Sequence, residues 1–80
     1  MPTTDRIKTN LRNNNPVYGS FDGWGNRHAA VIYGFNESES YYIHDPLHGS
    51  MIGYLVLDVV TYYIPADNAA INLYQGCVVN

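Results

Sequence analysis

Residues 27–46, RHAAVIYGFNESESYYIHDP, carry the clearest structural signal in the sequence. Residues 29–35 form an almost unbroken apolar run and residues 40–44 are rich in tyrosine and isoleucine, so both segments are predicted to be β-strands. Residues 36–39 between them are polar and typical of a turn, which makes the pair a β-hairpin. Because both strands carry apolar residues on both faces, we expect the hairpin to lie centrally in a sheet that is covered on two sides.

The hairpin predicts that His28 and Asp45 lie close together. Antiparallel neighbours run in opposite directions about 5 Å apart, so the start of the first strand meets the end of the second. A carboxylate beside an imidazole fixes its tautomer and stabilises the imidazolium, as in two members of a catalytic triad. The alternatives are a hydrogen-bonded structural histidine and an ordinary turn that starts at Asp45-Pro46.

The hairpin segments resemble a known family of enzymes. Residues 27–36, RHAAVIYGFN, and residues 41–49, YYIHDPLHG, are similar to the GHAVVVxGYD and YxxxDPxxG patterns of papain-like cysteine peptidases, most closely the C39-like bacterial branch. The resemblance covers most of the chain and extends to the C-terminal half of the family fold. It implies that His28 is the general base and that Asp45 is its orienting partner.

The catalytic cysteine of that family has no counterpart at the matching place. In the family the nucleophile opens a long helix upstream of the histidine, whereas the single cysteine of this chain is Cys77, close to the C-terminus in an apolar run. A buried thiol in apolar surroundings has a raised pKa and is a poor nucleophile. We therefore expect the nucleophile on a separate N-terminal lobe, and the chain alone to be inactive.

Three further residues are candidates for substrate binding. Trp24 and Gly25 lie in a glycine-rich loop that, in the resembling family, precedes the histidine and shapes the cleft. Leu47 stands two residues after Asp45, where the family usually has a bulky aromatic side chain that shields the histidine and aspartate from water. The alternative for Trp24 is simple packing over the core.

The sequence predicts neither a metal site nor a cofactor. His44 and His48 flank Asp45, but strand neighbours point to opposite faces, and Pro46 prevents the helix that would align the two histidines. Transition-metal sites need three or four convergent ligands. Unless His28 joins them, only two candidate ligands lie near each other.

Composition limits the partners and the compartment. Eighty residues make one domain at most, and such a chain buries roughly 60% of its unfolded surface, which is marginal. The hydrophobic share of 46% and the eight tyrosines therefore predict association with the missing lobe or a second copy, besides a peptide or protein substrate. A net charge of −3 with only four Lys and Arg argues against nucleic acid, and no stretch predicts a membrane span. We expect a cytoplasmic protein if Met1 is the native start, and a secreted or cell-surface one if the chain is cut from a longer precursor.

The rest of the chain predicts the architecture. Residues 4–12 form an amphipathic helix that ends before Pro16, and residues 16–21 form a short strand. Residues 50–64 make one long or two short strands interrupted at Asp58, and residues 65–76 a helix, with a closing strand after it. We expect residues 1–80 to form a single α+β domain. Its curved antiparallel sheet, a half-barrel with an N-terminal helix and a short C-terminal helix, would resemble the C-terminal lobe of the papain-like fold.

Three functions follow from these expectations. The first is the His/Asp-bearing lobe of a C39-like cysteine peptidase that hydrolyses peptide bonds. The second is a non-catalytic, peptidase-like binding or dimerisation module, and the third is a fragment of a papain-like acyltransferase.

Overall fold

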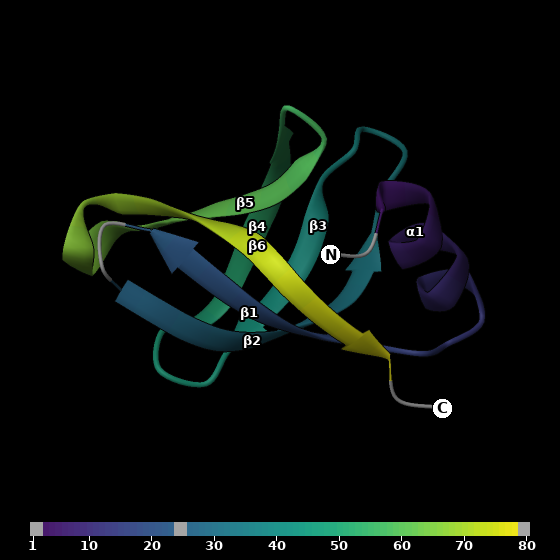
Figure 1. Cartoon of the computed structure of the whole chain (residues 1–80), viewed down its shortest axis with the longest axis horizontal. Helices are drawn as coiled ribbons and strands as arrows, with labels where there is room; N and C mark the ends of the chain where they lie inside the picture. The colour runs from purple at the N-terminus through teal and green to yellow at the C-terminus, as the bar shows by residue number, and fades with distance from the viewer. Residues whose placement is uncertain (1–2, 24–25, 79–80) are drawn as a thin grey trace.

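The chain folds into one α-helix followed by six β-strands within residues 3–23 and 26–78, which are the residues described by a computed structural model. In chain order the elements are α1 (Thr4–Arg12), β1 (Val17–Gly23), β2 (Asn26–Phe35), β3 (Tyr41–Asp45), β4 (Gly49–Val56), β5 (Val59–Ile64), the 3₁₀ turn η1 (Pro65–Asp67) and β6 (Ala69–Val78). Each strand pairs antiparallel with the next one, and β6 returns to pair with β1. The strands therefore form a closed barrel, with α1 at one side (Figure 1).

Helix α1 agrees with the predicted helix and packs against β1 and β2. Thr3 caps it, since its hydroxyl accepts a hydrogen bond from the Arg6 amide at 3.3 Å. Ile7 is buried in the core, and the Arg12 guanidinium lies 5.3 Å from the centre of the Phe35 ring at the end of β2. The helix thus covers one part of the barrel and lies outside its hydrogen-bonded wall.

The β2–β3 hairpin is present as predicted, with Val31 opposite His44 and Phe35 opposite Tyr41. Its turn is held by Asn36, whose side-chain oxygen accepts hydrogen bonds from the amides of Ser38 and Ser40. The prediction that both faces of the hairpin are covered is wrong. Along β3 buried residues alternate with more accessible ones, because one face points into the barrel and the other points outward.

The interior of the barrel is filled by buried apolar side chains from five strands and from α1, and β4 adds the partly buried Met51 and Leu55. The fully or almost fully buried members are Ile7, Val17, Phe21, Ala30, Ile32, Tyr41, Ile43, Val60, Tyr62, Ile64, Ile71 and Leu73. Gly53 makes room for the two large tyrosines, since it pairs with Tyr41 on one side and Tyr62 on the other. A Cβ atom at Gly53 would lie 2.6 Å from the Cδ1 atom of Ile43. The small barrel therefore depends on a glycine at this position.

The predicted open half-barrel with a C-terminal helix is wrong. Residues 65–76 form only the short turn η1 before they enter β6, and Asn68 ends that turn in the left-handed conformation with φ 48°. From there burial alternates, with Ala69, Ile71 and Leu73 turned inward. This period of two is that of a strand, and the pairing of β6 with both β5 and β1 outweighs the helical tendency of the alanines.

The predicted interruption at Asp58 separates two strands, β4 and β5. Leu57 and Asp58 make the two-residue turn between them, with φ angles of 50° and 64°. In the described residues no helix is long and apolar enough to cross a membrane.

Candidate functional site

The hairpin places His28 and Asp45 at the same end of the barrel interior. His28 shares the inward face of β2 with Ala30 and Ile32, and Asp45 shares the inward face of β3 with Ile43. The Nδ1 atom of His28 lies 3.9 Å from the Oδ2 atom of Asp45. The side chains are 12% and 1% exposed. The predicted proximity is confirmed, at a distance that suits an ion pair and is longer than a hydrogen bond.

Asp45 is held by four hydrogen bonds. Its Oδ1 atom accepts from the backbone amides of Leu47 at 2.8 Å and His48 at 3.2 Å, as expected of an aspartate that begins a turn. Its Oδ2 atom accepts from the Tyr62 hydroxyl at 2.8 Å and lies 3.0 Å from His48 Nδ1. Because a carboxylate can only accept, the Nδ1 atom of His48 carries the proton in this contact. The carboxylate is therefore fixed in position before any substrate binds.

These hydrogen bonds also set the charge state of Asp45. Burial alone raises the pKa of the carboxyl group, but the hydrogen bonds from Tyr62, His48 and the Leu47 amide together outweigh it and hold the pKa below its ordinary value. In the same contact, burial and the neighbouring carboxylate raise the pKa of Tyr62. Asp45 is thus an anion at neutral pH, despite being buried.

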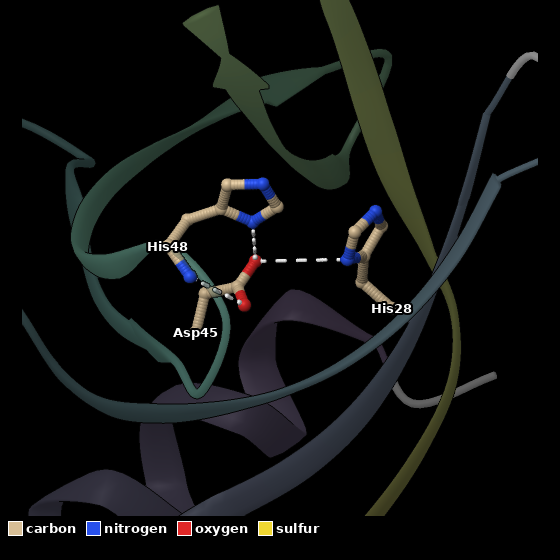
Figure 2. A group of neighbouring side chains, drawn as sticks. All are labelled: His28, Asp45 and His48. Carbon is tan, nitrogen blue, oxygen red and sulfur yellow. Dashed lines mark hydrogen bonds and ion pairs between the residues drawn. The ribbon is translucent and has the colours of Figure 1, made fainter. Parts of the chain in front are cut away.

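His48 joins the pair, although it is not among the site residues predicted from the sequence. Its ring centre lies 5.2 Å from that of His28, and both rings are turned toward the Asp45 carboxylate (Figure 2). The turn that begins at Asp45 could have indicated this contact, because an aspartate at the start of a turn accepts hydrogen bonds from the residues that follow it. One ligand atom each from His28, Asp45 and His48 lies within 4.8 Å of the other two. The sequence predicts two neighbouring candidate ligands unless His28 joins them, and His28 does join them, so three candidate ligands lie close together here.

Tyr62 and Asp67 are the other residues that sequence reasoning missed. Tyr62 lies on β5, where its ring packs edge-on against Phe21 at 4.9 Å between centres. Asp67 lies in η1, within residues 65–76, which the sequence predicts to be a helix. Its Oδ2 atom lies 3.8 Å from the Nε2 atom of His28. His28 therefore has a carboxylate near each ring nitrogen, Asp45 at Nδ1 and Asp67 at Nε2.

Of the three predicted substrate-binding residues, the structure describes only Leu47. Trp24 and Gly25 lie outside the described residues. Leu47 lies in the turn after Asp45 with 75% of its surface exposed, and its backbone amide, rather than its side chain, contacts the carboxylate. Their binding roles stay predictions.

Cys77 lies in β6, where its backbone pairs with Tyr18. His28 instead pairs with Phe21, three residues further along the same strand β1. At about 3.3 Å per residue, the two positions are separated by roughly 10 Å along the strand direction, besides the width of two strand spacings. The fold therefore does not bring the backbone of Cys77 to His28.

This arrangement of side chains is suited to two kinds of chemistry. A histidine ring beside the Asp45 carboxylate can accept a proton, or the two histidines and the carboxylate can together bind a metal ion.

Comparison with known families found that the model of the papain-like cysteine protease AvrRpt2 family matches residues 3–56. Comparison with curated proteins and with solved structures gave no significant match.

Proposed function

Because the chain belongs to the papain-like cysteine protease AvrRpt2 family, we propose that it is the histidine- and aspartate-bearing lobe of a protease that cleaves peptide bonds through a cysteine thiolate. The observation that carries the proposal is the contact between His28 and Asp45 at 3.9 Å, with the carboxylate fixed by four hydrogen bonds. The matching family is that of AvrRpt2, not the C39-like branch. The proposed roles of His28 as general base and Asp45 as its orienting partner follow the C39-like pattern of residues 27–49.

In the proposed mechanism His28 takes the proton from the attacking thiol and later gives it to the leaving amine. Asp45 orients the ring and stabilises the imidazolium, which needs a carboxylate that stays ionised. The lowered pKa of Asp45 meets that need. A shortening of the 3.9 Å contact toward hydrogen-bond length on substrate binding is compatible with the geometry of active sites before they are occupied.

The thiolate would come from another segment, which we propose to be a second lobe that completes the cleft. The chain has one cysteine, Cys77, and its strand position separates it from His28. The same lobe would cover apolar side chains that the barrel leaves exposed. Those on the outside of the strands that are at least two fifths exposed include Tyr18, Tyr33, Ile52, Tyr54 and Tyr63.

These exposed side chains also favour a second candidate function, a non-catalytic module that binds a peptide or a second copy of itself. A constant oligomer mass on dilution, with no thiol-dependent turnover in the full-length natural protein, would support the module over the protease. An acyltransferase shares the thiolate chemistry up to the acyl-enzyme. It differs in passing the acyl group to an amine, so mass spectrometry of the products distinguishes an amide from a free acid.

The decisive experiment measures cleavage of a fluorogenic peptide library by the full-length natural protein that contains this chain. We expect His28→Ala to abolish turnover. Cys77→Ala and the matched surface variant His44→Ala should retain it. Circular dichroism and urea unfolding check that each variant is folded.

Loss of turnover in Cys77→Ala with an intact fold, or full turnover in His28→Ala, would overturn the assignment. Turnover by the isolated 80 residues that depends on His28 would overturn the need for a second lobe.

A further inference from the structure

We propose that His28, Asp45 and His48 form a binding site for a divalent transition metal ion, with Zn²⁺ as the best match to the donor set. The site is distinct in chemistry from the proposed protease, and its existence does not depend on peptide cleavage. Two imidazole nitrogens and one carboxylate oxygen are a common set of three protein ligands for zinc, with a fourth position left to water.

The distances fit such an ion. Zinc with bonds of about 2.0–2.1 Å in tetrahedral geometry holds its ligand atoms about 3.3 Å apart. The Asp45 Oδ2 atom lies 3.0 Å from His48 Nδ1 and 3.9 Å from His28 Nδ1. The widest separation among the three donors stays within 4.8 Å. Small rotations of the two rings, which already face the carboxylate in Figure 2, would close the remaining gap.

The surroundings of the three donors also suit a metal. Metal-bound histidines usually direct their second nitrogen to a carboxylate or carbonyl group. Asp67 supplies such a carboxylate 3.8 Å from the Nε2 atom of His28, the nitrogen opposite the one that faces Asp45. Asp45 is positioned by the Tyr62 hydroxyl and by two backbone amides. Asp45 is thus oriented by hydrogen bonds from outside the donor set, and Asp67 lies within ion-pair distance of His28.

Metal binding would change the tautomer of His48. In the metal-free protein the Nδ1 proton of His48 lies between that nitrogen and Asp45; a zinc ion would take this place, and the neutral ring would then carry its one proton on Nε2, so that no net proton is released. No bond is oxidised or reduced. Because His28 is also the base of the proposed protease, a bound zinc ion would block proton transfer there, so the metal would act as a reversible inhibitor.

The test uses the 80-residue chain freed of metal with a chelator and titrated with ZnCl₂ by isothermal titration calorimetry. CoCl₂ serves as a spectroscopic probe of the coordination number. We expect one ion per chain and the intense visible absorption of four-coordinate cobalt. His48→Ala should weaken binding at least about tenfold, and Asp67→Asn about tenfold, through loss of the partner of His28.

The matched control is His44→Ala, which removes the exposed histidine of the neighbouring β3 position and should bind as the unchanged chain does. Equal losses in His44→Ala and His48→Ala, or no saturable binding by the folded chain, would overturn the site. If His48→Ala fails to fold, Asp67→Asn provides the test instead. An unchanged zinc affinity in Asp67→Asn would contradict the proposed coordination of zinc by His28. Zinc binding together with a lack of peptidase activity in the chelator-treated, metal-free full-length protein would support this site and refute the protease. Peptidase activity without saturable zinc binding would refute the site alone.

Discussion

The Tyr62 hydroxyl on β5 donates a 2.8 Å hydrogen bond to the Oδ2 atom of Asp45 at the end of β3. The two residues lie on strands that are not neighbours, so the bond crosses the interior of the barrel. It connects the most buried charge of the site to the core, because the Tyr62 ring packs on Phe21. Asp45 is therefore held by the barrel as well as by its own turn.

The first prediction concerns that bond. Tyr62→Phe keeps the ring and removes the donor, which leaves a buried carboxylate with one partner fewer. We expect a loss of about 1.5–3 kcal/mol in the free energy of unfolding, measured with urea. Tyr63→Phe is the control: its hydroxyl bonds the Asn68 side chain at 2.6 Å on an exposed surface and should cost less. Equal losses would contradict a special role for the buried contact.

The second prediction concerns acid. The pKa of Asp45 is held below its ordinary value in the folded chain, so its hydrogen bonds contribute stability that is present above the ordinary value of about 3.9. That contribution is lost as the pH falls through the ordinary value toward the lower folded pKa. Urea unfolding in the presence of a chelator at pH 6, 4 and 3 should show the decline.

Asp45→Asn is the matched variant for this measurement. It should be less stable at pH 6 and should lose less stability between pH 6 and pH 3, because the titrating group is gone. An identical pH dependence in the two proteins would mean that other carboxylates cause the decline.

The third prediction concerns space in the barrel. Gly53→Ala places a methyl group 2.6 Å from Ile43 Cδ1 and 3.2 Å from the Thr61 carbonyl oxygen, which is backbone and cannot rotate away. We expect the free energy of unfolding, measured with urea, to fall by about 1–3 kcal/mol. Ser50→Ala, at an exposed position of the same strand, should change stability by no more than about 0.5 kcal/mol. If Gly53→Ala left the free energy of unfolding unchanged, the strands around Gly53 would have to move apart to accommodate the methyl group, and the prediction would be wrong.

The fourth prediction is a gain of stability. Leu57 occupies a left-handed conformation with φ 50° in the β4–β5 turn and is 94% exposed. Asparagine tolerates that conformation better than leucine, so Leu57→Asn should stabilise the chain by about 1 kcal/mol in thermal unfolding. Leu57→Ala removes the apolar side chain but keeps the backbone strain. If alanine stabilised as much as asparagine, strain would not be the cause.

The hairpin and the first helix could be predicted because their signals are local. An apolar run, a polar turn centred on Asn36 and a tyrosine-rich run specify β2 and β3, and Pro16 marks where α1 has to have ended. The proximity of His28 and Asp45 followed from strand direction alone.

The errors came from contacts between distant segments. The alanines before Ile71 favour a helix locally, and only the pairing of β6 with β1 and β5 makes them a strand. The same pairing turns a half-barrel into a closed one. Tyr62 and Asp67 contact the site only in the folded barrel, so the local sequence around either residue could not predict its contact with Asp45 or His28.

The closure of the barrel also bears on how the chain folds. Val17 pairs with Val78, near the far end of the sequence, so the β1–β6 ladder requires a long loop to close before it contributes any stability. We expect the local hairpins to form first and the last strand to dock slowly. A ribosome-bound or proteolysed chain without β6 would present two unpaired strand edges, β1 and β5, and such edges recruit other chains into aggregates.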